Sequence, residues 1–372
     1  MDEAGAYALH FPLQEDYMMI TIDPLDNDMT RRADMKSHLP EGYTSRPATL
    51  EDLDNMVATV NSAARQTTGR DEITAREYRV YLEQPAFHAE TDLRLVLSPQ
   101  GQAAGICEFW DLAEPHVRYN TWGRVHPEHQ GKGIGSYLLE WVDRRAQQAL
   151  ARSPDGARVI VQTYVPVLLE GASELFREHD YQLIRHALRM VIDLNGALQA
   201  AQWPQGIQVR TLNVGEDIAE ILHAVRDSFK DHWGFIKAPF AQDYERWTHF
   251  IHNDENFDPS LWFLAMEGAE IAGISLCWPR SDDDHELGWV GTLGVRRPWR
   301  QRGLGMALLQ HSFGAFYQRG KRRVGLGVDA QSLTGATRLY LKAGMRPDPT
   351  FEHVLYEKEL RPGIDLSTQS LS

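Results

Sequence analysis

The sequence has few cysteines and no cluster of metal ligands. Only two cysteines, Cys107 and Cys277, occur in 372 residues, and both lie in apolar, strand-like runs. Two such thiols exclude a disulfide framework and a cysteine-rich zinc site, so we expect reduced, structural cysteines. The 15 histidines do not show metal-ligand spacing either, and we expect no metal.

Long apolar runs and excess positive charge are also absent. No stretch reaches the roughly eighteen apolar residues that a membrane-spanning helix needs. The N-terminus is acidic and lacks the basic start of a secretory signal, so we expect a cytoplasmic protein without a membrane partner. With 38 Lys and Arg against 52 Asp and Glu, the formal net charge is −14, which argues against a nucleic-acid partner. A polyanionic ligand must therefore be bound by a local basic site.

The length of 372 residues exceeds what one hydrophobic core usually supports, and equivalent positions recur along the chain. Gly133 and Gly303 are 170 residues apart, and Phe176 and Tyr340 are 164 apart. Two copies of one α/β unit explain this spacing. We predict an N-terminal extension at 1–38, a first domain at 39–195, a linker at 196–206 and a second domain at 207–372.

Both halves are expected to contain the same elements in the same order. A strand and a helix precede a pair of strands joined by a short turn, and a further strand leads into a glycine-rich turn and an amphipathic helix. In the first half, one face of that helix carries Ile134, Tyr137, Leu138, Trp141 and Val142. Another strand, a short helix and a last strand complete each half.

The two glycine-rich turns are Gln130-Gly131-Lys132-Gly133-Ile134-Gly135 and Arg300-Gln301-Arg302-Gly303-Leu304-Gly305. Glycines let the backbone approach a ligand, and the following helix presents unpaired N–H groups to an anion. A dinucleotide-binding crossover is the competing interpretation, but its glycines usually follow the first strand, whereas here several strands precede each turn. The sequence also lacks the G-x-x-x-x-G-K-[ST] phosphate loop.

Both turns match the pattern [Gln or Arg]-x-x-Gly-x-[Gly or Ala], and the chain therefore resembles the GNAT acetyltransferase superfamily over roughly residues 40–360. The resemblance implies an α/β fold of two tandem domains, each with a twisted, mostly antiparallel mixed sheet, flanking helices and a splayed strand pair that holds coenzyme A. It also implies acetyl-CoA as cofactor. The implied cofactor-binding residues are Leu293, Val295, Arg300, Gln301, Arg302, Gly303, Leu304, Gly305, Met306 and Ser332 in the second half, and Val125, Gln130, Gly131, Lys132, Gly133, Ile134 and Gly135 in the first.

The tandem arrangement resembles the mycothiol-synthase-like branch of that superfamily, in which the C-terminal domain carries the chemistry. In many relatives a tyrosine on the short helix after the fifth strand protonates the departing thiolate. Tyr340 stands at that place in the second half, whereas Phe176, which cannot donate a proton, stands there in the first. The resemblance thus implies a catalytic C-terminal domain and a structural or regulatory N-terminal domain.

The general base is harder to assign. Many relatives have a glutamate on the fourth strand, where this chain has Trp289 and Tyr119. Glu286 is the nearest carboxylate, but it reaches the same face only if a bulge intervenes. Asp231 and His232 are alternatives for the base, acting through water. The candidates for the acceptor pocket are Asp231, His232, Trp233 and Trp289.

Other departures and alternatives remain open. Ser332 stands where relatives often have an asparagine that contacts the pantetheine arm. The acidic run at 282–284 is expected to be a hairpin turn rather than a patch that attracts an amine. The basic run at 321–323 is expected to be a solvated junction between a helix and a strand. The aromatic residues between 229 and 250 suggest either an apolar pocket or a packing surface. We expect an N-acetyltransferase acting on a small-molecule primary amine, as a monomer or homodimer. The alternatives are a non-catalytic acyl-CoA-binding protein and an acyltransferase for a hydroxyl acceptor or another acyl group.

Overall fold

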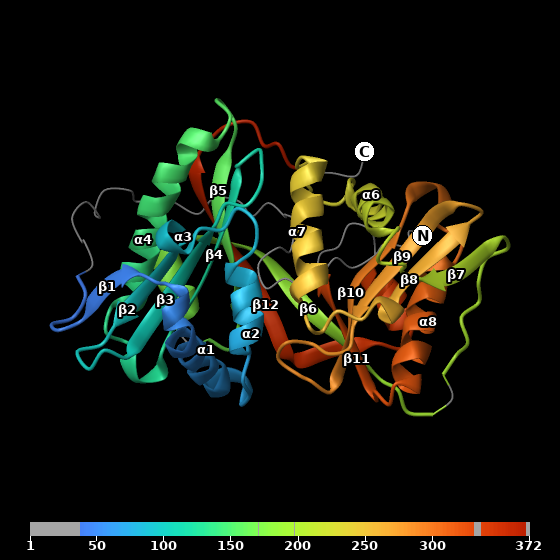
Figure 1. Ribbon diagram of the computed structural model, residues 1–372, viewed down its shortest axis with the longest axis horizontal. Helices are drawn as coiled ribbons and strands as arrows, with labels where there is room; N and C mark the ends of the chain where they lie inside the picture. Colours follow the sequence, from blue (N-terminus) through green and yellow to red (C-terminus); the bar gives the residue numbers. More distant parts are fainter. Residues whose placement is uncertain (1–37, 170, 197, 331–335, 370–372) are drawn as a thin grey trace. The chain divides into compact units, whose positions relative to one another are not determined.

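The structure is a computed structural model that describes residues 38–169, 171–196, 198–330 and 336–369 (Figure 1). These residues form two compact units. The N-terminal unit holds residues 38–184 together with Tyr356–Asp365, and the C-terminal unit holds Arg185–Leu355 and the residues from Leu366 onward. The boundaries between the units fall at 184/185 and at 355/356, each of them inside a strand. The expected domain limits at 195 and 207 instead separate the two copies of the repeat along the chain.

The described residues of the first half form eleven strands and α-helices. They are β1 (Thr44–Pro47), α1 (Leu53–Thr68), α2 (Ala75–Leu82), α3 (Ala89–Asp92), β2 (Leu93–Leu97), β3 (Ala103–Trp110), β4 (Arg118–Val125), α4 (Ile134–Ala149), β5 (Val159–Pro166), α5 (Ala172–Glu178) and β6 (Gln182–Asp193).

The second half repeats this order without a counterpart of α3. Its elements are β7 (Ile207–Thr211), α6 (Ile218–Phe229), α7 (Phe240–Asn253), β8 (Trp262–Glu267), β9 (Glu270–Trp278), β10 (Leu287–Val295), α8 (Leu304–Gln318), β11 (Arg323–Asp329), α9 (Ala336–Lys342) and β12 (Arg346–Arg361).

The repeat extends to individual ion pairs. In the first half Arg46 donates to both carboxylate oxygens of Asp52, at 2.7 and 2.6 Å. In the second half Arg210 binds Asp217 in the same way, at 2.6 and 2.7 Å. In both cases the arginine comes from the first strand and the carboxylate from the start of the following helical segment. This shared pairing supports the prediction of two copies of one unit.

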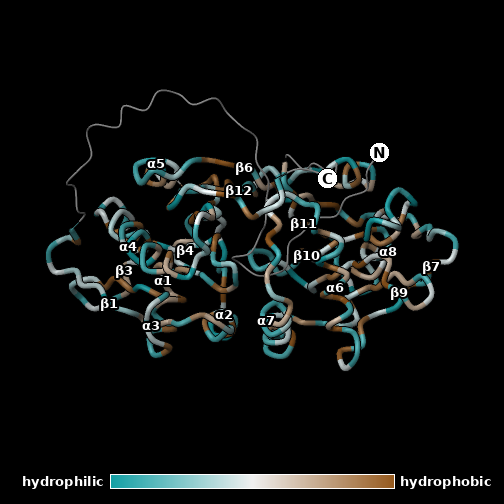
Figure 2. The backbone as a smooth tube through the Cα atoms, turned by 90° about the horizontal axis from the view of Figure 1, so that it is seen from above, coloured by the Kyte–Doolittle hydropathy of each residue, from teal (hydrophilic) through white to brown (hydrophobic). Residues whose placement is uncertain are grey.

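Each unit has a mostly antiparallel sheet with one parallel pair. The strand order is β1-β2-β3-β4-β5 in the N-terminal unit, and β6-β11-β10-β9-β8-β7 in the C-terminal unit. The parallel pairs are β4 with β5 and β10 with β11. Figure 2 shows hydrophobic stretches inside each unit and hydrophilic turns at its edges. The expected α/β fold with a mixed sheet is confirmed.

Two apolar clusters cover the two faces of the C-terminal sheet. One cluster joins Leu304 and Leu308 of α8 to Leu293 of β10. The other joins α6 and α7 to the opposite face, where Trp289 lies. Every residue of β10 is buried, as expected for a central strand covered on both sides. Among the described residues, no helix has the length and apolar character needed to cross a membrane.

The expected strands and helices are largely confirmed, with two differences. Strand β6 begins at Gln182 and β12 at Arg346, whereas the sequence suggested 187 and 351. Most of the additional residues are polar or proline, and Arg185 and Arg346 among them form ion pairs with Asp329 and Asp193. Helix α7 was not anticipated, because its aromatic residues were interpreted as a pocket or a packing surface.

Candidate active site

The parallel strands of the C-terminal unit pair only at their beginnings. The ladder joins Leu287–Trp289 of β10 to Arg323–Gly325 of β11, and both strands continue beyond it. Between Val290 and Thr292 the pairing of β10 with β9 shifts by one residue, which marks a β-bulge. A bulge releases backbone groups from the ladder and changes which face the following side chains point to. The ends of β10 and β11 no longer pair with each other, although each keeps its other neighbour, β9 or β6. These two ends, with the bulge at their base, are called the C-terminal wedge.

The N-terminal unit has the same opening. Its ladder joins Arg118–Asn120 of β4 to Ile160–Gln162 of β5, and a cavity of about 420 Å³ lies beyond that point. The register of β3 with β4 is continuous from Gly105 to Trp110, without the shift seen in β10. The cavity is lined by six of the seven residues expected to bind coenzyme A in this half: Val125, Gln130, Gly131, Gly133, Ile134 and Gly135.

Each wedge ends at a glycine turn with a left-handed backbone. Gly133 precedes α4 with φ 79°, and Gly303 precedes α8 with φ 83°. Because the cap residue is a glycine, no cap side chain takes up the first helical N–H groups. Helix N-termini of this kind bind phosphates, so both turns fit the pyrophosphate of coenzyme A.

The first residues of the two motifs, Arg300 and Gln130, join each turn to the end of the preceding strand. Arg300 donates to the carbonyl of Val295 at 3.0 Å, and Gln130 reaches the equivalent carbonyl of Val125 at 3.5 Å. Arg300 also binds Asp231 through both terminal nitrogens, at 2.5 and 3.0 Å. Its guanidinium therefore fixes the end of β10 and leaves ligand binding to the backbone.

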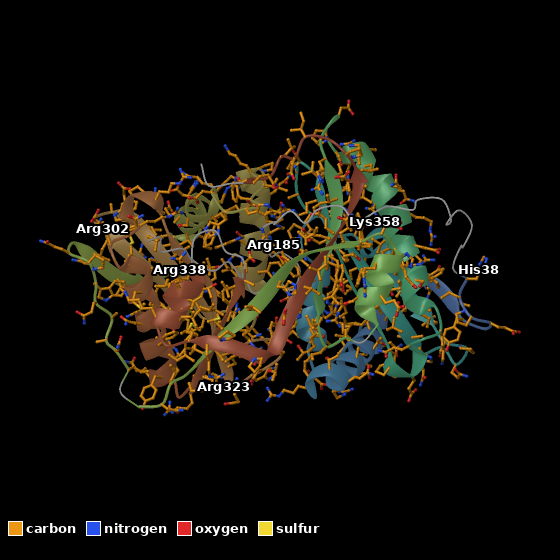
Figure 3. All side chains as sticks on the ribbon, turned by 180° about the vertical axis from the view of Figure 1, so that it is seen from behind. His38, Arg185, Arg302, Arg323, Arg338 and Lys358 are labelled. Atoms are coloured by element: carbon orange, nitrogen blue, oxygen red, sulfur yellow. The ribbon has the colours of Figure 1, made fainter. Side chains whose placement is uncertain are left out.

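The other basic residues of the turns lie further out. Arg302 is partly exposed and binds Glu267 at 2.8 Å, and Figure 3 labels it. Lys132 donates to the carbonyl of Glu128 at 2.9 Å. Both side chains add positive potential near the glycine turns. Of the remaining residues expected to bind the cofactor, Leu293, Val295 and Leu304 are buried, Met306 is half-buried, and Ser332 lies outside the described residues.

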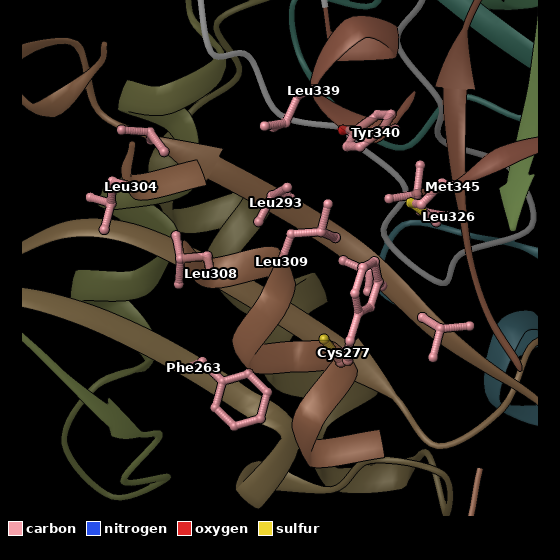
Figure 4. Packing of buried hydrophobic residues seen from close by; sticks show 14 of the residues in the cluster. Phe263, Cys277, Leu293, Leu304, Leu308, Leu309, Leu326, Leu339, Tyr340 and Met345 are labelled. Atoms are coloured by element: carbon pink, nitrogen blue, oxygen red, sulfur yellow. The ribbon is translucent and has the colours of Figure 1, made fainter. Parts of the chain in front are cut away.

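Tyr340 lies on α9, at the core side of the C-terminal wedge. It is fully buried and belongs to the same apolar cluster as Leu293 of β10 and Leu326 of β11 (Figure 4). In the N-terminal unit Phe176 lines the cavity and stacks on Tyr356, with ring centroids 5.3 Å apart. The two units therefore place a phenol and a phenyl ring at the same point of the fold.

The structure does not bring Glu286 to the wedge. Glu286 is exposed and precedes β10, where its backbone N–H donates to Asp284 at 3.1 Å. The bulge lies after Trp289 and so does not change the direction of Glu286. Trp289 itself is 8% exposed and faces the α6 and α7 side of the sheet.

The loop after α6 contains the other candidates for the acceptor pocket. Burial opposes ionisation of Asp231, but hydrogen bonds from Arg300 and Arg297 hold its pKa at about 2. Burial lowers the pKa of His232 to about 4, and its ring packs on Phe229 with centroids 4.7 Å apart. Asp231 therefore remains an ion-paired carboxylate and His232 a neutral, weakly basic imidazole at pH 7. Trp233 is 5% exposed.

The acidic and basic runs are used within the fold. Asp283 binds Arg189 at 2.7 Å, and Asp284 binds Arg323 at 3.0 Å, so the 282–284 run forms a turn held by arginines. Lys321 donates to the carbonyl of His285 at 2.6 Å. Of the aromatic residues between 229 and 250, Phe229 and Trp247 belong to the apolar cluster on the sheet, which favours a packing role for them.

Sequence reasoning missed two buried carboxylates. Glu108 of β3 is 1% exposed and accepts a hydrogen bond from Tyr78, and burial raises its pKa to about 8. Asp329, the last residue of β11, is 6% exposed and pairs with the buried Arg185 at 3.3 Å. A single acidic residue in an apolar strand run was the available signal for Glu108, and the position of Asp329 at the end of a buried strand was the signal for the other.

Known proteins resemble the chain in both halves. The model of the Acetyltransferase (GNAT) family matches residues 222–345, and that of an Acetyltransferase (GNAT) domain matches residues 86–183. A mycothiol acetyltransferase from Streptomyces scabiei is 29% identical over 244 residues, which are 63% of this chain and 68% of the relative. Another, from Streptomyces griseus, is 26% identical and covers 85% of this chain and 95% of the relative.

Solved structures extend this likeness to the whole fold. A GCN5-related N-acetyltransferase from Sphaerobacter thermophilus is 34% identical, with a TM-score of 0.71 over 90% of this chain and 100% of that one. A tandem GNAT protein from the clavulanic acid biosynthesis pathway is 15% identical and shares the fold, with a TM-score of 0.62 over 86% of this chain and 99% of that one. Two family matches, two wedges and two glycine turns lead to one conclusion: the chain belongs to the GNAT acetyltransferase family, as an N-acetyltransferase with two GNAT domains in tandem that uses a coenzyme A-based acyl donor.

Proposed function

We propose that the chain transfers the acetyl group of acetyl-CoA to the primary amine of a small molecule, and that the reaction takes place in the C-terminal unit. The observation that carries this proposal is the combination found in the C-terminal wedge: a bulged β10, an open helix N-terminus after Gly303, and Tyr340 beside both strands. The corresponding opening between β4 and β5 in the N-terminal unit, the N-terminal wedge, has the glycine turn. However, β3 and β4 pair there without a bulge, and Phe176 stands in the place of Tyr340. Relatives named mycothiol acetyltransferases favour a small-molecule acceptor.

In this mechanism the donor supplies an activated thioester, and the chain binds and orients it. The N–H groups that follow Gly303 hold the pyrophosphate, and the edge of β10 that no longer pairs with β11, near Leu293 and Val295, aligns the pantetheine arm. The amine approaches from the side of Trp289 and attacks the thioester carbonyl directly. Tyr340 gives its phenolic proton to the departing thiolate, a contribution typically worth about 10²- to 10⁴-fold in rate.

The proton of the amine needs a different route. Asp231 has a pKa of about 2 and His232 of about 4, so neither is a strong base at neutral pH. We infer that the ammonium form of the acceptor loses one proton to water before it attacks. The second proton, which the nitrogen loses as the amide forms, passes through water and restores the Tyr340 phenol. The rate at limiting amine should then rise with pH up to the pKa of the acceptor itself, without an inflection from either residue.

The test measures thiol release with a panel of amines for the unmodified chain and for Tyr340→Phe. We expect the variant to lose about 10²- to 10⁴-fold in kcat, with little change in the KM for acetyl-CoA. Disruption of the Gln130 turn is the matched control and should leave turnover unchanged. Activity that survives Tyr340→Phe but not disruption of the Gln130 turn would move the reaction to the N-terminal unit.

A non-catalytic acyl-CoA-binding role is the second candidate, because Trp289 occupies the place where many relatives have their base. Calorimetry that shows tight acyl-CoA binding without turnover of any amine would favour it. A hydroxyl acceptor or a longer acyl group is a third candidate, which mass spectrometry of the products separates from N-acetylation.

A further inference from the structure

The last described residues of the chain bind the loop that follows α6. After Tyr356–Asp365, which belong to the N-terminal unit, the segment from Leu366 to Gln369 belongs to the C-terminal unit again. The N–H of Gly234 donates to the carbonyl of Thr368 at 2.8 Å, and the N–H of Thr368 donates to the carbonyl of Phe235 at 3.0 Å. The Thr368 hydroxyl adds a bond to the carbonyl of Lys230 at 3.1 Å. Two backbone bonds and one side-chain bond thus join the segment to this loop.

Trp233 lies at the centre of the same loop and is held from two sides. Its indole N–H donates to the side-chain oxygen of Gln369 at 3.0 Å. Its ring lies against the guanidinium of Arg185, with the guanidinium carbon 5.1 Å from the ring centroid. Arg185 is 1% exposed and pairs with Asp329 at 3.3 Å. A continuous series of contacts therefore runs from Gln369 through Trp233 and Arg185 to Asp329.

This series ends on the acceptor side of the C-terminal wedge. Along β11, Val324, Leu326 and Val328 belong to the apolar cluster that contains Tyr340. Because strand residues alternate between faces, Gly325 and Asp329 point to the other side, where Trp289 lies. A Cβ added to Gly325 would come within 3.2 Å of the Trp289 ring, which places this part of β11 directly beside that indole. Asp329 lies four residues further along, beyond the ladder with β10, where β11 remains paired with β6.

The N-terminal unit differs at the corresponding position. Trp289 pairs with the last residue of β9 and with Gly325 of β11, as Asn120 pairs with the last residue of β3 and with Gln162 of β5. Asp329, four residues after Gly325, therefore corresponds to Pro166, which lines the N-terminal cavity. The C-terminal wedge therefore carries a polar residue on both faces, Tyr340 and Asp329, where the N-terminal wedge carries apolar ones. A buried ion pair costs desolvation, and such groups often serve specificity rather than stability.

We propose that the C-terminal segment Leu366–Gln369 is a positioning element of the acceptor site. It fixes Trp233 as one wall of that site and thereby sets the Arg185–Asp329 pair beside the wedge. The acceptor that fits is a polar small molecule whose ammonium or hydroxyl groups bind the carboxylate of Asp329 while its carbon skeleton packs on Trp233. This inference rests on the proposed function, because it assigns the acceptor side of the same site.

Three substitutions test the proposal in the full-length chain. Gln369→Leu removes the acceptor for the Trp233 N–H, and Thr368→Pro removes the N–H that binds Phe235. Gln369→Glu keeps an acceptor oxygen and is the matched control. We expect the first two to raise the KM for the amine about five- to tenfold, with the KM for acetyl-CoA and kcat within about twofold of the unmodified chain. Gln369→Glu should retain the KM of the unmodified chain.

Hydrogen exchange followed by mass spectrometry gives a readout that does not depend on activity. In the unmodified chain, without substrate, the amides of Gly234 and Thr368 should be protected, and Thr368→Pro should accelerate exchange at Gly234 about tenfold or more. Rapid exchange at both amides in the unmodified chain overturns the proposal. Faster exchange in the variant with an unchanged amine KM, or with an equal rise in both KM values, also overturns it, because the segment would then be merely structural. Absence of turnover by the unmodified chain with every amine instead refutes the proposed function, and this inference with it.

Discussion

In the N-terminal unit the glycine turn opens onto a cavity that ends at Phe176, whereas in the C-terminal unit the equivalent turn leads to Tyr340. The turns themselves have nearly the same backbone, with φ of 79° at Gly133 and 83° at Gly303. The differences lie in the strands: β10 has a bulge, whereas the β3–β4 register is continuous. The two units thus share the glycine turn before the helix, whereas the strands that lead to it and the short helices α5 and α9 differ. An intact glycine turn therefore indicates an anion site, whereas catalysis has to be argued from the residues beside the turn, such as Tyr340.

After the loss expected for Tyr340→Phe, the next largest effect concerns the glycines of the two turns. Neither Gly133 nor Gly303 has an atom within 4 Å of an added Cβ, and both have a left-handed backbone, so valine would cause backbone strain at either position. A left-handed β-branched residue costs roughly 1–2 kcal/mol, which the turn can relieve by changing shape. Gly303→Val should raise the KM for acetyl-CoA about tenfold in steady-state assays. Gly133→Val imposes the same strain in the other unit and should leave turnover unchanged; a comparable loss there would mean that both turns serve the reaction.

A smaller effect is expected at Asp231, which supports only the C-terminal turn. Its carboxylate binds Arg297 and Arg300. In the N-terminal unit Gln130 stands in the place of Arg300, and its side-chain amide donates to Gln66 at 3.0 Å. Asp231→Asn removes the carboxylate charge that Arg297 and Arg300 share, and breaking a buried pair of this kind costs up to about 3–5 kcal/mol. We expect a lower melting temperature and a several-fold higher KM for acetyl-CoA.

The pH dependence of this variant sharpens the test. The pKa of Asp231 is lowered to about 2 from its usual 3.8, so the stability it contributes is present above pH 4 and is lost as the pH falls through 2. The difference between the variant and the unmodified chain should therefore be constant from pH 5 to pH 8. Gln66→Ala is the N-terminal control and should change neither the KM nor the melting temperature substantially. If both substitutions had the same effect on the KM, the proposed difference between the turns would be wrong.

The repeat and the cofactor turns could be predicted because they rest on local features. Glycines at fixed spacing before an amphipathic helix specify the turn directly, and the 170-residue offset reveals the second copy. The Asp329–Arg185 pair could not be predicted, because it joins strands that are 144 residues apart in sequence. The contact of Gln369 with Trp233 spans 136 residues and has no sequence signal of its own. Local patterns therefore specify the donor side of the site, and long-range pairing specifies the acceptor side.

The smallest expected effect concerns the buried carboxylate of the N-terminal unit. Glu108 pairs with Trp122 in the sheet, where the C-terminal unit pairs Leu276 with Thr292. Burial raises the pKa of Glu108 from 4.5 to about 8, so the folded chain keeps a proton that the unfolded chain releases. Its contribution to the free energy of unfolding is therefore complete below pH 4.5 and declines as the pH rises to 8.

Glu108→Gln cannot ionise and retains an oxygen for the Tyr78 hydroxyl. Its stability should match that of the unmodified chain near pH 5 and exceed it near pH 8.5, by about 2–4 °C in melting temperature for each kcal/mol gained. Glu83→Gln, at a side chain that is 47% exposed, is the control and should follow the unmodified chain at both pH values. An unchanged difference between Glu108→Gln and the unmodified chain across this range would show that Glu108 is ionised in the fold. The N-terminal unit would then hold a buried negative charge beside its cavity, and its role as a passive copy of the C-terminal unit would need to be revised.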